Sequence, residues 1–335
     1  MLYDRRHIVV RAPTRVSFAG GGTDFEEFAH EFGPGHTVSA TINLYSHIHL
    51  KDMFDTNVRV HHETIETAAT ASRIRHPYAR IALERHGLFR GIELTMTSDV
   101  MATGSGLGTS SSLMAALITA CRAFRDESQL DPGDLANTTY QLETEAGTVG
   151  GLQDQYAVAY GGLNAITYHE NEITVDPIAL APEVESAFSD RLVLVYTNLA
   201  RFDHEIQVRH REGIADGARA DYLERILAIS HEFRAELTKQ RPDIDLLGGI
   251  LHESWQLKQE FNPSVTNVYV AQLYEHLRKN GIIGGKILGA GGGGFILAIV
   301  RDGAKQRLMY DLYPNFVAVD FRIVHKGAEI AWQNW

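Results

Sequence analysis

The stretch Asp99–Ala116, DVMATGSGLGTSSSLMAA, constrains the fold more than any other part of the chain. Just before it, residues 92–98 alternate between apolar and polar side chains, the period-two pattern of a half-buried strand. Apolar residues after Gly108 recur at helical spacing, so a helix is expected to begin there. Gly104, Gly106 and Gly108 carry no side chains and leave backbone N–H groups accessible at the N-terminus of that helix. The pattern predicts an anion site, and phosphate is the expected anion.

Composition places the chain among globular proteins and limits its partners. Its 335 residues suffice for two domains, and 44% are hydrophobic while 22% are charged, the balance of a chain with its own core. The formal net charge of −11 argues against nonspecific nucleic-acid binding. The longest apolar run near the C-terminus, Phe295–Val300, is too short to cross a bilayer, and the N-terminus lacks the apolar stretch of a signal peptide. We therefore expect a cytoplasmic protein with no nucleic-acid or membrane partner.

A second motif, APTRVSFAGGGTDF, follows a strand expected at His7–Arg11. Pro13 is expected to end this strand, and Gly20–Gly22 allow close approach of the backbone. Arg15 and Asp24 bracket the turn with opposite charges. On this motif alone, a glycine hairpin with a surface ion pair is as good an interpretation as a binding turn.

Two acidic residues lie on a pair of expected helices. Residues 132–148 form the first, which carries Glu143, and glycines separate it from a second helix that carries Asp154 in its first turn. Taken singly, Glu143 is explained as a solvated helix residue and Asp154 as a carboxylate that complements the helix dipole.

The domain boundary is expected between residues 170 and 191, where prolines and charged residues separate two apolar strands. The predicted division is an N-terminal domain at 1–180 and a C-terminal domain at 181–335. The latter contains a charged helical stretch at 203–240 and a second glycine cluster, KILGAGGGGFILAIV, that begins at Lys286.

Neither of the common glycine-rich nucleotide motifs fits its context here. Gly289–Gly294 satisfies GxGxxG, but a strand-like run follows it and no βαβ unit surrounds it. The central loop lacks the lysine of a Walker A motif. A dinucleotide-binding fold and a standard P-loop are therefore both disfavoured.

Three motifs in order, PTRVSFAGGGTD, GSGLGTSSS and KILGAGGGGF, span nearly the whole chain. Together they resemble those of the GHMP kinases, the family of galactokinase, homoserine kinase, mevalonate kinase and phosphomevalonate kinase. The first motif departs from the family's more common GEHTD-like turn, because residues 21–24 read GGTD. The resemblance implies an α+β chain with a two-domain GHMP kinase fold, an active site in the interdomain cleft, and ATP and Mg²⁺ as cofactors.

Within that family the GGGTD and GSGLGTSS variants are similar to those of bacterial D-glycero-D-manno-heptose 7-phosphate kinases. This resemblance implies ATP-dependent phosphorylation of the anomeric C1 hydroxyl of a sugar phosphate, which gives a 1,7-bisphosphate for nucleotide-activated heptose. A fucokinase-like or other sugar-1-kinase is the alternative within the same class. An inactive sugar and nucleotide sensor is the alternative from another class, and a homodimer is also left open.

The resemblance further implies roles for individual residues. Asp154 is expected to accept the proton of the attacking hydroxyl with Arg15 beside it, while Ser110 and Glu143 are expected to hold Mg²⁺. The backbone that holds the triphosphate comprises Gly104, Ser105, Gly106, Leu107, Gly108, Thr109, Ser110 and Ser111. The residues expected to bind the sugar are Asp24, Gly21, Gly22, Gly291 and Gly292. Candidates for the phosphate that the substrate already carries are Arg73, Arg75 and Lys286.

Overall fold

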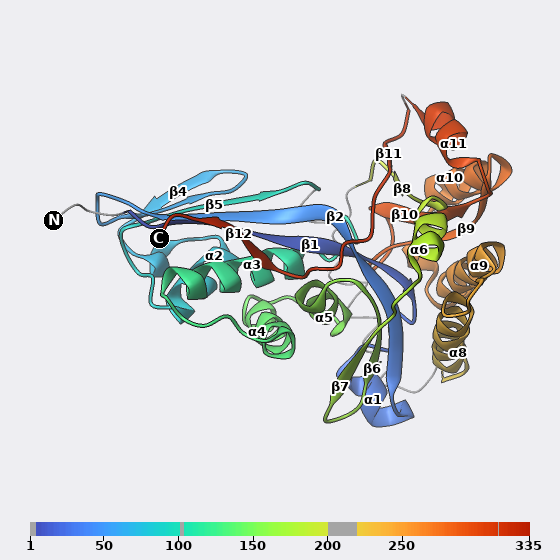
Figure 1. Cartoon of the computed structure of the whole chain (residues 1–335), viewed down its shortest axis with the longest axis horizontal. Helices are drawn as coiled ribbons and strands as arrows, with labels where there is room; N and C mark the ends of the chain where they lie inside the picture. Colours follow the sequence, from blue (N-terminus) through green and yellow to red (C-terminus); the bar gives the residue numbers. More distant parts are fainter. Residues whose placement is uncertain (1–4, 101–103, 200–219, 314) are drawn as a thin grey trace.

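Two β-sheets with helices packed against them form the protein, as the computed structural model shows (Figure 1). The structure describes residues 5–100, 104–199, 220–313 and 315–335. The larger sheet has the order β12-β1-β2-β5-β3-β4, and β6 pairs with both β2 and β7. The smaller sheet has the order β11-β8-β10-β9. The α+β class expected from the sequence is confirmed.

The strands are β1 His7–Ala19, β2 Gly35–Asp52, β3 Val58–His61, β4 Ile65–Ala68, β5 Ile92–Ser98, β6 Leu163–Tyr168, β7 Ile173–Pro177, β8 Leu192–Tyr196, β9 Ile282–Ile287, β10 Phe295–Val300, β11 Ala318–Val319 and β12 Glu329–Gln333. The helices are α1 Glu26–Phe32, α2 Pro77–Arg85, α3 Thr109–Phe124, α4 Pro132–Glu145, α5 Gln153–Tyr160, α6 Pro182–Ser189, α8 Ala220–Leu237, α9 Ile244–Phe261, α10 Val268–Lys279 and α11 Lys305–Leu312, with short 3₁₀ turns η1 Ala71–Arg73 and η2 Pro263–Val265.

Strand β2 runs through the larger sheet and pairs with three other strands. It pairs with β1 along nearly its whole length, while residues 35–40 also pair with β6 and residues 46–52 with β5. Its first half is buried on both faces, and its second half alternates between buried and half-buried residues. This change of pattern is expected when other elements pack on both faces of the sheet along the first half of the strand and on only one face along the second half.

The expectation that Pro13 ends the first strand is wrong. Strand β1 continues to Ala19, and its register against β2 shifts between Pro13 and Thr14. An irregularity of this kind is where a strand tolerates proline, because the missing N–H would not enter the ladder. Arg15 therefore lies within the strand and not in the turn that follows.

The helix expected after the central glycine loop is confirmed. Helix α3 begins at Thr109, directly after Gly108, which has the left-handed φ of 66°. Most of its residues are buried, because it packs between β1 and β2 on one side and α4 and α5 on the other. The two expected helices that carry Glu143 and Asp154 are α4 and α5.

An apolar core joins the two halves of the chain. Phe18 of β1 stacks on Phe233 of α8 at 5.3 Å between ring centroids and lies 5.4 Å from Phe188 of α6. The same cluster includes residues of β2 and β6 from the first half and of β8, β10 and α9 from the second. Of the helical stretch expected at 203–240, α8 accounts for residues 220–237, and residues 203–219 lie outside the described part.

The last strand returns to the sheet of the first half. β12 pairs with β1 in antiparallel fashion, and Ile323 forms a bridge with Ile42. The division of domains at residue 180 stays a prediction, but residues 329–333 lie in the larger sheet.

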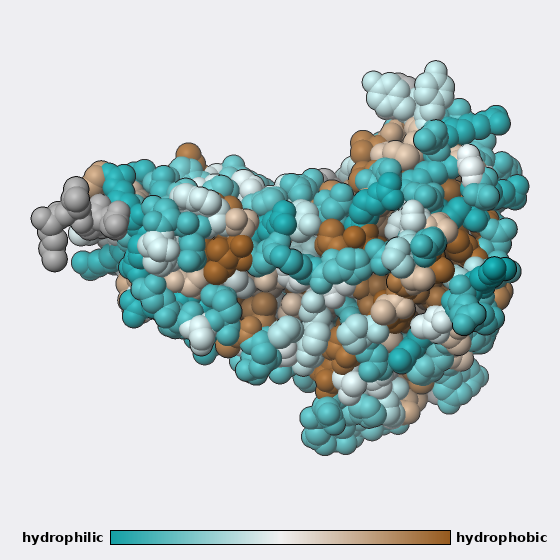
Figure 2. All heavy atoms as spheres, viewed as in Figure 1, coloured by the Kyte–Doolittle hydropathy of each residue, from teal (hydrophilic) through white to brown (hydrophobic). Residues whose placement is uncertain are grey.

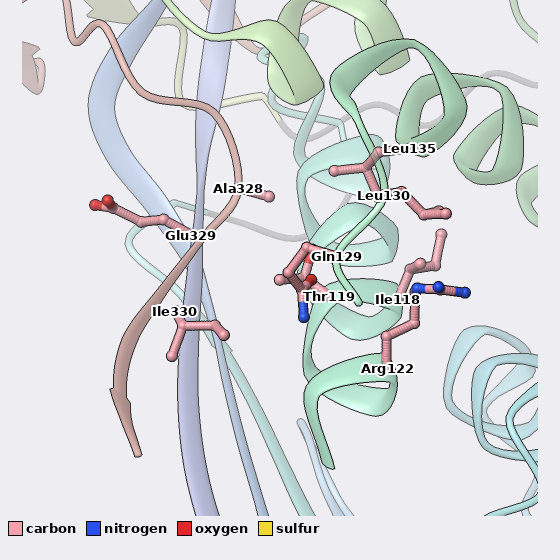
Figure 3. Close-up of a pocket in the computed structure, with 9 residues that line it drawn as sticks. All are labelled: Ile118, Thr119, Arg122, Gln129, Leu130, Leu135, Ala328, Glu329 and Ile330. Atoms are coloured by element: carbon pink, nitrogen blue, oxygen red, sulfur yellow. The ribbon is translucent and has the colours of Figure 1, made fainter. Parts of the chain in front are cut away.

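A cavity of about 160 Å³ lies beneath β12, away from the predicted site residues (Figure 3). Its lining comes from α3, from α4 and the segment before it, and from residues 328–330. No predicted catalytic or binding residue contributes to it.

Polar residues cover most of the face of the molecule drawn in Figure 2, with hydrophobic residues scattered among them. Among the described residues, no helix combines the length and apolar content that a membrane span requires.

Replacing Phe18 by alanine is expected to lower the free energy of unfolding by about 3–5 kcal/mol, because its buried ring contacts both α6 and α8. Chemical denaturation followed by circular dichroism measures the change. The control is Tyr310→Ala, at a side chain that is 80% exposed, for which a change within about 0.5 kcal/mol is expected. Equal stability of the two variants would contradict this account of the shared core.

Candidate active site

Two glycine loops from distant parts of the chain meet backbone to backbone at the N-terminus of α3. Gly106 has a φ of 76°, and a Cβ placed there would lie 2.5 Å from the carbonyl oxygen of Leu288. A Cβ on Gly289 would in turn lie 2.8 Å from the Cα of Gly106. The N–H of Phe295 also donates to the carbonyl oxygen of Ser105 at 3.1 Å. This close approach, together with the left-handed backbone, explains why glycine stands in both loops.

Side chains of the first loop hold its shape. The hydroxyl groups of Ser105 and Thr109 lie 2.9 Å apart, and the Ser105 hydroxyl accepts from the N–H of Leu107 at 3.2 Å. All three side chains are buried, and Leu107 belongs to the shared apolar core. The loop therefore offers a ligand its backbone and the half-buried Ser110.

Arg15 and Asp154 form a bidentate ion pair beside this loop. Nε of Arg15 donates to Oδ1 of Asp154 at 2.7 Å, and Nη2 donates to Oδ2 at 2.6 Å. Nη1 of Arg15 donates to the carbonyl oxygen of Gly106 at 2.6 Å. The backbone N–H of Arg15 donates to the carbonyl oxygen of Leu107 at 2.9 Å. The Arg15 side chain is 5% exposed and that of Asp154 is 27% exposed. The pair thus links β1, α5 and the loop, and leaves the carboxylate accessible.

Glu143 is a buried carboxylate held by neutral donors. It accepts from the hydroxyl of Ser111 at 2.7 Å, from Nε2 of Gln155 at 2.7 Å and from the hydroxyl of Tyr78 at 3.0 Å. Burial raises its pKa, and hydrogen bonds from Ser111, Gln155 and Ser110 oppose that shift. Among the described residues no arginine or lysine forms an ion pair with it.

This arrangement fits a hard divalent cation. Mg²⁺ prefers oxygen ligands, and in enzymes it commonly takes one or two protein oxygens and completes its shell with phosphate and water. Ser110 and Glu143 supply a hydroxyl and a carboxylate side by side. Within the described ranges no group of three or more His, Cys, Asp or Glu residues gathers at one point, so an all-protein metal cage is not the form that this site would take.

Asp24 is fixed by one backbone N–H of its own turn and one at the start of α5. Its Oδ1 accepts from the N–H of Gly22 at 2.9 Å, and its Oδ2 accepts from that of Gln153 at 3.2 Å. A Cβ on Gly151 would lie 2.1 Å from Oδ2, so the close packing requires glycine there. Burial raises the pKa of Asp24, and the charge of Asp154 raises it further. Arg15 pairs with Asp154, so the ion pair suggested between Arg15 and Asp24 does not form.

The remaining predicted glycines differ in their surroundings. Gly21 is open, with only the Ser17 hydroxyl near the position of a Cβ, at 3.8 Å. A Cβ on Gly291 would lie 2.6 Å from Cβ of Val265, and the N–H of Gly292 donates to the Val265 carbonyl at 2.7 Å. Close packing onto η2 thus accounts for glycine at position 291.

Two lysines reach this region from the second half of the chain. Nζ of Lys286 on β9 donates to the carbonyl oxygen of Phe18 at 3.1 Å, and Nζ of Lys258 on α9 donates to that of Gly289 at 2.6 Å. Burial lowers the pKa of Lys286 to about 7 and that of Lys258 to about 8. Lys258 has no motif around it, so no sequence signal pointed to it.

The other two candidates for a phosphate pocket lie on the surface. Arg73 is exposed. The side chain of Arg75 is 84% exposed and pairs with Glu66 at 3.4 Å. Of the three cations considered, only Lys286 is buried near Asp24.

Comparison with known proteins identifies the family to which the chain belongs. The model of the GHMP kinases N terminal domain matches residues 65–162, and that of the GHMP kinases C terminal domain matches residues 233–315. A relative in Campylobacter jejuni, D-glycero-alpha-D-manno-heptose 7-phosphate kinase, is 31% identical over 97% of this chain and 99% of its own. This chain belongs to the GHMP kinase family and is an ATP-dependent phosphotransferase with a hydroxyl group as acceptor.

Solved structures share the fold. A D-glycero-D-manno-heptose 1-phosphate kinase from Bacteroides thetaiotaomicron has a TM-score of 0.79 at 21% identity, with 99% of each chain covered. Lactococcus lactis galactokinase complexed with galactose has a TM-score of 0.72 at 18% identity, with 96% of this chain and 95% of that chain covered.

Gly108→Ala is expected to lower kinase turnover beyond the effect of its loss of stability, which a control variant with the same backbone cost shares. A Cβ there would lie 3.1 Å from Cγ of Arg15 and 3.2 Å from Oδ2 of Asp154, so it would press on the ion pair. Gly303→Ala is the matched control, since Gly303 has a φ of 68° but nothing within 4 Å of its Cβ position. Both variants carry the left-handed backbone cost of about 1–2 kcal/mol. Steady-state kinetics and thermal unfolding separate the two effects, and equal turnover in both variants would be inconsistent with this geometry.

Proposed function

We propose that the protein transfers the γ-phosphoryl group of ATP to the anomeric C1 hydroxyl of D-glycero-D-manno-heptose 7-phosphate. The observation that carries the proposal is the accessible Asp154 carboxylate, oriented by Arg15 beside the glycine loop at the N-terminus of α3. The name and full-length similarity of the Campylobacter jejuni relative support the choice of acceptor.

In this proposal Asp154 receives the proton of the sugar hydroxyl. Each carboxylate oxygen has two lone pairs, so acceptance from Arg15 leaves sites for the hydroxyl. As the C1 oxygen bonds to the γ-phosphorus, its proton passes to Asp154 and the bond from phosphorus to the β–γ bridging oxygen breaks. Arg15 stabilises negative charge on the transferring group. A modest base suffices, because phosphoryl transfer depends mainly on position and electrostatics.

The phosphates of ATP are proposed to lie on the backbone N–H groups of residues 104–111. A helix N-terminus favours anions through its unpaired N–H groups and its dipole. The absence of side chains at Gly104, Gly106 and Gly108 lets the backbone approach the phosphates.

Ser110 and Glu143 are proposed to hold Mg²⁺. When bound, the ion neutralises charge on the phosphates. Ser111, Gln155 and Tyr78 donate to the Glu143 carboxylate and so fix its orientation. Because this carboxylate is buried and has no cationic partner in the described part of the chain, a bound metal would also offset the cost of its charge.

Asp24 is proposed to bind sugar hydroxyls, with Gly21 and Gly22 in the same turn. Its two oxygens are held by backbone N–H groups and keep lone pairs for the acceptor. Gly291 and Gly292 are proposed to lie along the acceptor, where the carbonyl oxygen of Val265 holds the N–H of Gly292.

Purified protein with Mg²⁺ and ATP is expected to phosphorylate heptose 7-phosphate in preference to fucose or galactose. Nucleotide consumption measures turnover, and phosphorus–proton coupling in the product's NMR spectrum identifies the hydroxyl that reacts. Preferred use of fucose would support the fucokinase-like alternative, and no turnover with any sugar would favour the sensor. A product phosphorylated at a position other than C1 would exclude the proposed regiochemistry.

In the same assay Asp154→Asn is the catalytic test. Loss of a general base is expected to lower turnover by about 100- to 10,000-fold, while ATP binding measured by calorimetry persists. Asp302→Asn, at an exposed aspartate, is the matched control and is expected to match wild type. Unchanged turnover in Asp154→Asn would remove this residue from the proposed role.

Glu143→Gln is expected to weaken the binding of Mg²⁺ without loss of the fold, because the amide keeps the shape of the side chain but lacks the charge. Mutation of residues that only hydrogen-bond to metal ligands typically lowers metal affinity by about 10–100-fold. Loss of a ligand's charge is therefore expected to raise the Mg²⁺ concentration for half-maximal turnover by at least about 10-fold. Metal titration of chelator-treated protein measures this. Glu145→Gln on the exposed side of α4 is the control, since its carboxylate pairs with Arg85. The same metal response in both variants would count against Glu143.

A further inference from the structure

Two lysines in the candidate site have no negatively charged partner among the residues that the structure describes. Lys286 is 7% exposed, and its Nζ donates to the carbonyl oxygen of Phe18. Lys258 is partly buried, and its Nζ donates to the carbonyl oxygen of Gly289. Across the described parts of the chain, neither forms an ion pair with a carboxylate.

The charges around these lysines are unbalanced. Lys258 and Arg15 both lower the pKa of Lys286, in addition to burial, while only Asp24 raises it. Arg15 already has Asp154 as its counterion. The ammonium groups of Lys286 and Lys258 are each held by a carbonyl oxygen, and within the described residues neither has a carboxylate counterion. That of Lys286 is buried, and a buried charge without a counterion is costly. A dianion between them would offset that cost with charge-assisted hydrogen bonds.

We propose that Lys286 and Lys258 bind the phosphate that the acceptor sugar already carries, and that they thereby select a sugar phosphate over a free sugar. This inference rests on the proposed function. It assigns binding residues to the phosphate of the acceptor sugar, for which the residues around Asp154 supply no partner in the proposed mechanism.

The position of Lys286 favours the acceptor's phosphate over the transferred phosphoryl group. The transferred group already has Arg15 and the N-terminus of α3 as partners in the proposed mechanism. Lys286 instead contacts Phe18, on the strand that leads into the Asp24 turn, and the charge of Asp24 acts on it. The phosphate would therefore lie on the side of the site where the sugar hydroxyls are proposed to bind.

Lys286→Met and Lys258→Met test this by removing the charge and keeping most of the side-chain volume. Each is assayed with heptose 7-phosphate and with the same heptose lacking phosphate. A hydrogen bond to a charged group is worth about 1.5–3 kcal/mol, or roughly 10–150-fold. The KM for the phosphorylated acceptor is expected to rise by that factor, with kcat, the KM for ATP and turnover of the free heptose little changed.

Lys279→Met on α10 is the control for loss of an exposed lysine and is expected to match wild type. Lys286→Arg keeps the charge and is expected to recover part of the affinity, which a purely structural role would not require. An equal loss with both acceptors, or a fall in kcat together with a change in the KM for ATP, would overturn the inference and assign the lysines to the transferred phosphate.

Calorimetry without ATP separates this inference from the proposed function. Wild-type protein is expected to bind heptose 7-phosphate more tightly than free heptose, and the methionine variants are expected to lose that difference, whether or not turnover occurs. If wild type shows no preference for the phosphorylated sugar, the lysine site is wrong. If it binds with that preference but does not transfer phosphate to C1, only the proposed function is wrong.

Discussion

The ion pair between Arg15 and Asp154 joins the parts of the chain on which the site depends. Arg15 comes from the middle of β1, Asp154 from the first turn of α5, and the same guanidinium holds the carbonyl oxygen of Gly106. A single planar cation with several donors can make these contacts at once, which a lysine could not do. The glycine loop, the proposed base and the strand that leads to Asp24 therefore keep one fixed geometry.

The carboxylates of the site are compensated in different ways, and the differences match their proposed roles. Asp154 has an arginine, Asp24 has backbone N–H groups, and Glu143 has neutral donors only. Among the described residues of the site, Glu143 and the lysine pair are thus charged groups without a partner of opposite charge. Each would be stabilised by a ligand of opposite charge, Mg²⁺ in one case and a phosphate in the other.

Much of the fold could be predicted because its signals are local. Alternation along β5, the start of α3 after Gly108 and the two helices with Glu143 and Asp154 follow from neighbouring residues. The passage of β1 through Pro13 and the return of β12 to β1 could not be predicted in this way. Both depend on pairing between segments far apart in the chain, which no local pattern encodes.

By itself the sequence determined the kinds of groups at the site: glycine loops, a serine-rich helix start, two helical carboxylates and an arginine. Their order also indicated the family, which the comparisons then confirmed. Only the tertiary structure decided the partners, because the contact of Arg15 with Asp154 and of Gly106 with Leu288 arises when distant elements pack. The arrival of Lys258 beside the second glycine loop was likewise set by the packing of α9 on β9.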